Sequence, residues 1–212
     1  MTVVITGASR GIGEGLARAY AARGTDTIGT TRDAGWQLDV TDPGSVARFA
    51  GALEDRPVDL LVCNAGVYLD KGHVIGKGYQ PEIWARSFAA NVTGVFLTIE
   101  ALLPALRRAD SAKIAIISSQ MASSERAPGG SYVYRASKAA VLNLGRNLAA
   151  DLASEGIAVG IYHPGWVKTD MGSMSADITV EEAVAGLMAR FEALNMNTTG
   201  CFETWDGRAH PF

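Results

Sequence analysis

A tyrosine and a lysine stand four residues apart, at Tyr134 and Lys138, within a helical pattern of apolar residues. Residues at i and i+4 share one face of a helix, so the phenol and the ammonium are expected side by side. A neighbouring ammonium stabilises the phenolate and lowers the pKa of the phenol from its ordinary value of about 10. The pair therefore predicts a group that exchanges a proton with a substrate oxygen, although an inert helix surface can carry the same two residues.

Two serines, Ser118 and Ser119, follow the apolar run Ile114–Ile117. Such a run predicts a buried strand, and doubly wound sheets place their sites at the carboxyl ends of strands. A hydroxyl at this position can donate a hydrogen bond to a substrate oxygen on which negative charge develops. Either serine can fill that role, and the alternative is that both only satisfy the end of the strand.

A glycine-rich turn near the N-terminus joins the β-branched segment Val3–Thr6 to a helical pattern over Ile12–Arg23. Gly7, Gly11 and Gly13 lack a Cβ, so they allow positive φ and close approach of the backbone to a phosphate. The helix start offers N–H groups and the positive end of a dipole. This spacing predicts a cradle for the pyrophosphate of a dinucleotide.

Strand and helix patterns alternate along the whole chain, which predicts an α/β fold with a doubly wound (Rossmann), mostly parallel seven-stranded sheet and helices on both faces. We expect one domain over residues 1–212. The expected strands are Val3–Thr6, Asp26–Thr30, Trp36–Asp39, Leu60–Cys63, Ile114–Ser118, Val159–His163 and Cys201–Thr204. The expected helices are Ile12–Arg23, Pro43–Leu53, Glu82–Asn91, Thr93–Arg108, Tyr134–Ser154 and Val180–Leu194.

The composition narrows the class of protein. A net charge of −3 gives no basic footprint, so we expect neither nucleic acid nor an anionic membrane as a partner. No apolar run approaches the length of a membrane span, and the first strand begins at once, so we expect no signal peptide. Two cysteines form no disulfide framework and favour the cytoplasm. Three scattered histidines predict no metal site.

Together these motifs resemble the short-chain dehydrogenase/reductase family over essentially the whole chain. The matching residues, in the order of the family, are the Thr6–Gly13 turn, Asp39-Val40, Asn64-Ala65-Gly66, Asn91 with Gly94, Ser118-Ser119, Tyr134 with Lys138, and Pro164-Gly165 with Thr169. Two segments resemble those of a narrower branch of the family, the C-factor-like and sniffer-like carbonyl reductases. They are the sequence Tyr134–Asn143 and the C-terminal Asp206-Gly207-Arg208 followed by Pro211 and an aromatic residue.

The resemblance implies an NADPH-dependent oxidoreductase that reduces a small or medium aldehyde or ketone. Its catalytic set would be Asn91, Ser119, Tyr134 and Lys138. Tyr134 would be the acid/base, Ser119 would orient the substrate oxygen, and Asn91 would hold a water that links Lys138 to solvent. From the residues alone, Asn91 has a second interpretation as a cap for the helix beginning at Thr93, since Asn is a poor interior helix residue.

The same resemblance implies the residues that hold the cofactor. Asp39 would bind the adenine amino group, the segment from Asn64 would line the adenosine side, and Pro164-Gly165 with Thr169 would hold the nicotinamide carboxamide. The full cofactor set is Gly7, Ser9, Arg10, Gly11, Ile12, Gly13, Thr31, Arg32, Asp39, Val40, Asn64, Ala65, Gly66, Tyr134, Lys138, Pro164, Gly165, Val167 and Thr169.

The end of the second strand predicts a preference for NADP(H) over NAD(H). Relatives that prefer NAD carry a carboxylate near this point, which repels a 2′-phosphate. Here Thr31 is neutral, and Arg32 and Arg10 offer two cations suited to phosphate oxygens. Asp33 leaves the alternative open, because a shift of two residues puts a carboxylate at the key position.

The segment between Thr169 and Thr179 is short, which predicts an open pocket and broad substrate selection. Fold relatives suggest a homodimer or homotetramer. The alternative to an enzyme is a dinucleotide-binding regulatory or signalling protein on the same fold. The complete catalytic set favours the enzyme, because a sensor needs no proton relay.

Overall fold

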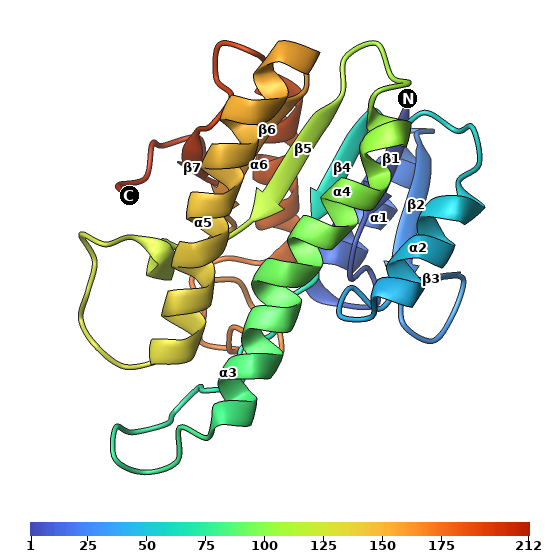
Figure 1. Cartoon of the computed structure of the whole chain (residues 1–212). Helices are drawn as coiled ribbons and strands as arrows, with labels where there is room; N and C mark the ends of the chain where they lie inside the picture. The colour runs from blue at the N-terminus through green and yellow to red at the C-terminus, as the bar shows by residue number, and fades with distance from the viewer.

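Seven parallel strands form one sheet in the computed structural model, which describes residues 1–212 (Figure 1). Their order is β3-β2-β1-β4-β5-β6-β7, so the predicted doubly wound sheet is confirmed and every pairing is parallel. The strands are β1 (Thr2–Ile5), β2 (Asp26–Thr31), β3 (Trp36–Gln37), β4 (Leu60–Cys63), β5 (Lys113–Ile117), β6 (Ala158–His163) and β7 (Phe202–Thr204).

Helices cover both faces of the sheet (Figure 1). They are α1 (Gly11–Ala22), α2 (Pro43–Ala52), α3 (Pro81–Phe88), α4 (Gly94–Leu106), α5 (Tyr132–Leu152) and α6 (Val180–Ala193). The hydrophobic core therefore has two parts, one on each face of the sheet. Val4 packs into a cluster of 27 buried residues with α2, α4 and α5, whereas Val3 and Ile5 pack into a cluster of 13 with α1 and α6. Alternate side chains of one strand serve opposite layers, which explains the continuous apolar strands.

The order of the strands reverses between β1 and β4, the neighbours from which the chain winds outward in both directions. In doubly wound sheets the site lies outside the carboxyl ends of the strands at this switch point. The glycine turn follows β1, and the segment from Asn64 follows β4. The topology therefore brings these two predicted segments together.

One expectation about the helices is wrong. Two helices separated at Val92 were predicted, but α3 and α4 are continuous through a π-helical turn at Ala89–Thr93. Thr93 makes no side-chain cap, and Asn91 lies inside the π turn with its amide turned away from the helix axis towards other elements. The interpretation of Asn91 as a helix cap is therefore wrong. Single π turns inside α-helices occur frequently at functional sites.

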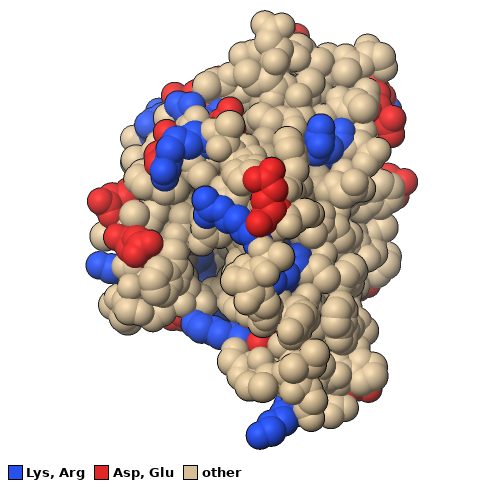
Figure 2. Space-filling view, turned by 90° about the vertical axis from the view of Figure 1, so that its left-hand side faces the viewer, with Lys and Arg blue, Asp and Glu red and all other residues tan.

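The continuous helix Pro81–Leu106 has the length and composition of a membrane span, with a mean hydropathy of 1.5 in its most apolar window. Half of that window is buried inside the fold, where Ile99, Leu102 and Leu106 contact the sheet layer. This is the pattern of a core helix. On the face shown in Figure 2, basic and acidic side chains are interspersed, with no continuous basic surface.

The third strand is shorter than the predicted Trp36–Asp39. Only Trp36 and Gln37 pair with β2. The N–H of Asp39 donates instead to the Ser45 hydroxyl, so the chain has left the sheet by this residue. The strand ends where the backbone of Asp39 bonds to Ser45, six residues later in the chain, and no local sequence pattern predicts this contact.

Candidate active site

The glycine turn between β1 and α1 is a close-packed cradle. Gly7 and Gly11 have φ of 69° and 58°, in the left-handed region that favours glycine. A Cβ on Gly13 would lie 2.3 Å from the Gly7 carbonyl oxygen and 2.5 Å from Nδ2 of Asn64. Helix α1 begins without a side-chain cap, so its first N–H groups can meet a phosphate. The other predicted residues of this turn are Ser9, Arg10 and Ile12.

The segment after β4 locks this turn in place. Asn64 donates from Nδ2 to the carbonyl oxygens of Thr6 at 2.9 Å and Gly7 at 3.1 Å. In return, the Thr6 hydroxyl accepts the N–H groups of Asn64 and Ala65, both at 3.0 Å. Ala65 also lies against Gly7, where a Cβ would approach its Cα to 2.9 Å. The cradle is thus a rigid, backbone-lined surface that fits a pyrophosphate.

Asp39 and Val40 were predicted to line the adenosine side of the cofactor. Asp39 accepts hydrogen bonds from the N–H and hydroxyl of Thr41, which hold the pKa of its carboxyl below the ordinary range. The neighbouring Val40 is buried, and its carbonyl packs on Gly94, where a Cβ would lie 2.7 Å away. A cavity of about 460 Å³ is lined by Asp39 and Arg32, among other residues.

The two cations predicted for the 2′-phosphate differ in their surroundings. Arg32 is exposed at the end of β2 and has no ion-pair partner. Thr31 beside it exchanges hydrogen bonds with the backbone of Ala34. Arg10, by contrast, pairs with Asp170 at 2.8 Å. The charge of Arg10 is therefore partnered, whereas that of Arg32 has no ion-pair partner.

Tyr134 and Lys138 share one face of α5, as predicted, with the ammonium 5.8 Å from the centroid of the phenol ring. Lys138 donates to the carbonyl oxygen of Ile117 at 2.8 Å, and its burial lowers its pKa to about 8. The expectation for the phenol is wrong in this structure. Burial raises the pKa of Tyr134 above its ordinary value, and only the hydrogen bond with Ser119 opposes the increase. A desolvated phenol stays protonated.

The two serines after β5 have different hydrogen-bond partners. Ser118 is buried and donates to the carbonyl oxygen of Lys138 at 3.0 Å, so it ties β5 to α5. Ser119 accepts the N–H of Met121 at 3.1 Å and interacts with the phenol of Tyr134. The geometry therefore favours Ser119 over Ser118 as the hydroxyl that faces a substrate.

Asn91 reaches from the π turn into the same region. Its Nδ2 donates to the Val67 carbonyl and the Ser137 hydroxyl, both at 2.9 Å, and its Oδ1 accepts the N–H of Val67 at 2.8 Å. Gly66 lies between this amide and the ammonium: a Cβ there would be 3.0 Å from Oδ1 of Asn91 and 3.6 Å from Nζ of Lys138. The four predicted catalytic residues therefore lie around one point.

The loop after β4 also supplies two site residues that the sequence did not reveal. Asp70 is fully buried and accepts the N–H groups of Val133 at 2.8 Å and Tyr134 at 3.2 Å. It caps α5 in place of Ser131, which has left-handed φ and makes no cap. Tyr68 stacks on Tyr134 with ring centroids 4.2 Å apart. The sequence contains no signal of this distant partner, because Ser131, directly before Tyr132, is a residue type favoured at an N-cap.

The loop after β6 closes the site on the opposite side. Gly165 follows Pro164 with φ of 90°, and a Cβ on it would lie 2.4 Å from the side chain of Ile178. Val167 forms a bridge with Ile178, so the short segment from Thr169 folds back on itself. The Thr169 hydroxyl donates to the Val167 carbonyl at 3.4 Å.

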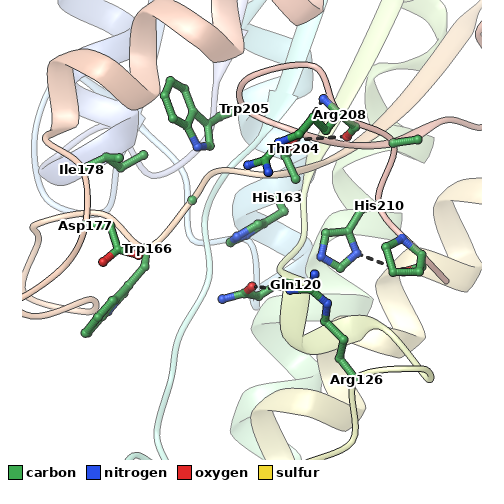
Figure 3. A pocket seen from close by; sticks show the side chains of 13 residues that line it. Gln120, Arg126, His163, Trp166, Asp177, Ile178, Thr204, Trp205, Arg208 and His210 are labelled. Carbon is green, nitrogen blue, oxygen red and sulfur yellow. Dashed lines mark hydrogen bonds between the residues drawn. The ribbon is translucent and has the colours of Figure 1, made fainter.

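A cavity of about 350 Å³ adjoins this loop (Figure 3). Gln120, which directly follows Ser119, lines it together with His163, Trp166 and the C-terminal segment. No group of three or more histidine, cysteine or acidic side chains is placed to hold a metal ion.

Known proteins are similar to this chain over most of its length. Residues 30–178 match the family model for short chain dehydrogenase. The chain is 35% identical to 1-hydroxy-2-glutathionyl-2-methyl-3-butene dehydrogenase of Rhodococcus sp. strain AD45 over 97% of both chains. It is also 35% identical to C-signal of Myxococcus xanthus, over 77% of this chain and 98% of that protein.

A solved structure is similar over the whole length. The NADPH-bound carbonyl reductase from chicken fatty liver superposes with a TM-score of 0.91 and 28% identity, covering 100% of this chain and 98% of the other.

Proposed function

The chain belongs to the short-chain dehydrogenase/reductase family and is an oxidoreductase, and from that premise we propose that it reduces small or medium aldehydes and ketones with NADPH. The observation that carries the proposal is the meeting of Tyr134, Ser119 and Lys138 at the carboxyl end of β5. The glycine cradle lies at the same edge of the sheet.

With NADPH held by the glycine turn and the loop after β6, the hydride would come from its nicotinamide. The chain's own residues manage the proton and the geometry: Tyr134 gives the proton of its phenol to the substrate oxygen, and Ser119 donates a hydrogen bond to that oxygen. Burial keeps the phenol protonated, which suits Tyr134 to act as the acid in the reductive direction. Lys138 and Asn91 provide the route by which the phenol regains a proton from solvent.

The proposed cofactor fits the residues present. A neutral Thr31 and an exposed, unpaired Arg32 suit a 2′-phosphate, which a carboxylate would repel. The similar carbonyl reductase of chicken liver binds NADPH. We assign the remaining predicted residues of the turn and of the loop after β6 to the pyrophosphate and to the nicotinamide.

The segment after Thr169 is short, so we propose that it encloses the substrate little and that the protein acts on several carbonyl compounds with high KM values. The similarity to C-signal keeps a signalling role as the second candidate. A reductase turns over carbonyl substrates, whereas a signalling protein binds NADPH without such turnover.

The test is NADPH oxidation by the purified protein against a panel of aldehydes and ketones, with Tyr134→Phe as the matched variant. Turnover of several compounds that the variant loses supports the reductase. NADPH binding without turnover of any panel member supports the signalling role instead. Selection of one compound by several orders of magnitude over its analogues contradicts the open pocket.

A further inference from the structure

The cavity at the carboxyl ends of β5, β6 and β7 has features that proton transfer at Tyr134 does not use. It has a volume of about 350 Å³, within the range of small-molecule sites. Figure 3 shows side chains from the ends of these strands and from the C-terminal segment around it. One wall is Gln120, the residue after Ser119, and another is Gly165. The cavity therefore adjoins the proposed reaction centre.

Two imidazoles in this cavity carry unpaired ring nitrogens. His163 and His210 are 8% and 6% exposed, and neither Nδ1 of His163 nor Nε2 of His210 has a hydrogen-bond partner. Nδ1 of His210 is already bonded to the Pro211 carbonyl at 2.9 Å. The two rings meet edge-on, 5.9 Å apart. Buried polar nitrogens without partners are rare, because each costs about 1–3 kcal/mol.

Cations surround these imidazoles. Arg126 bonds to Oε1 of Gln120 at 3.1 Å and has no carboxylate partner. Arg208 is paired with Asp206 at 2.8 Å. Burial lowers the pKa of His163 to about 4, and His210 and Arg126 add to this lowering.

The acidic lining residue lies elsewhere. Figure 3 shows Asp177 beside Trp166, across the cavity from Arg126. An anionic group near Arg126 therefore meets a planar guanidinium fork rather than a like charge.

We propose that this cavity binds a carboxylate of the substrate, which makes carbonyl compounds that carry a carboxylate the preferred substrate class. Arg126 offers guanidinium N–H donors that suit a carboxylate, and His163 and His210 line the same cavity. Fixing the carboxylate here holds the carbonyl group near Ser119. The preference among substrates rests on the proposed reductase function, whereas the carboxylate site itself does not.

The binding test needs no turnover. Benzoate added to the NADPH-bound protein should shift the imidazole NMR signals of His163 and His210 but not that of His73, and benzamide should shift none. Arg126→Gln should weaken benzoate binding about tenfold or more. The matched control is Arg107→Gln, which removes an exposed arginine paired with Glu155 and should bind benzoate as the wild type does. Unshifted histidine signals at saturating benzoate overturn the site.

The kinetic test compares 4-carboxybenzaldehyde with its methyl ester. We expect a KM about tenfold lower for the acid in wild type and in Arg107→Gln, and no such difference in Arg126→Gln. Equal KM values for acid and ester in wild type overturn the substrate preference while leaving the reductase in place. If neither aldehyde is reduced, the reductase function fails, and the benzoate experiment still decides the site.

Discussion

The glycine turn and the start of α5 both lie at the carboxyl edge of the sheet, where the proposed site is. Different kinds of contact fix their conformations. The turn is set by consecutive residues, whose glycines permit the positive φ and close contacts that it needs. The start of α5 has no cap of its own and depends on Asp70, more than sixty residues away. The conformation of the glycine turn is therefore encoded largely by its own residues, with Asn64 and Ala65 packed against it, whereas Tyr134, the proposed acid, is positioned chiefly by a long-range contact.

One loop connects the two regions. Asn64 bonds to the glycine turn, and six residues later Asp70 bonds to the first turn of α5. Changes in the turn should therefore act mainly on the cofactor, and changes at α5 mainly on the rate.

Tyr134→Phe should separate the two regions most clearly. It removes the proton donor but keeps the ring that stacks on Tyr68. We expect kcat to fall about 10²–10⁴-fold, the usual contribution of a general acid, with NADPH affinity nearly unchanged. Steady-state kinetics and NADPH fluorescence titration measure the two effects. Lys138→Met is the contrasting variant and should weaken both. A kcat above about a tenth of wild type in Tyr134→Phe contradicts the assignment.

Gly13→Ala should break the other region. Its Cβ would meet the Gly7 carbonyl oxygen at 2.3 Å, and backbone cannot yield as a flexible side chain does. We expect about 1–3 kcal/mol of lost unfolding free energy and weaker NADPH binding. Gly51→Ala is the matched control, because nothing lies within 4 Å of its Cβ and it sits in α2. That variant should gain roughly 0.5–1 kcal/mol in urea unfolding. Equal stability changes in the two variants refute the close-packed cradle.

Asp70→Ala tests the long-range cap. It leaves two buried N–H groups without an acceptor, at a cost of about 1–3 kcal/mol, and should lower kcat by displacing Tyr134. Asp70→Asn keeps one acceptor oxygen and should fall between this variant and wild type. Asp151→Ala removes an exposed carboxylate from the same helix and should change neither quantity. Thermal unfolding and kcat measured together distinguish a cap from a solvated loop residue.

The same contrast explains what the sequence could reveal. The seven strand segments, the glycine turn between β1 and α1 and the i, i+4 pair depend on local periodicity and spacing, and the structure has each of them where it was predicted, apart from the shorter β3. The continuous helix through Asn91 was not, because Asn disfavours helix interiors and only its bonds to Val67 and Ser137 stabilise the π turn. The raised pKa of Tyr134 was not predicted either, because burial outweighs a lysine whose ammonium bonds elsewhere.

The candidate residues of the loop after β4 were predicted only in part. Asn64, Ala65 and Gly66 belong to a recognisable motif, whereas Tyr68 and Asp70 lie in a Gly-rich segment with no periodicity. An aspartate in such a segment is normally solvated. Only the three-dimensional contact with α5 assigns it a role.

Arg32→Ala should have the smallest effect and the most selective one. Arg32 is exposed, so its contribution comes only from the charge it offers to a 2′-phosphate, which NADH lacks. We expect KM for NADPH to rise about tenfold and KM for NADH to stay within about twofold, with kcat unchanged for both. Arg10→Ala should shift the preference less, since Asp170 already neutralises Arg10. Comparing kcat/KM for both cofactors in the three proteins decides the matter: a wild-type preference for NADH, or equal losses for NADPH and NADH in Arg32→Ala, would show that the carboxylate of Asp33 rather than Arg32 sets cofactor choice.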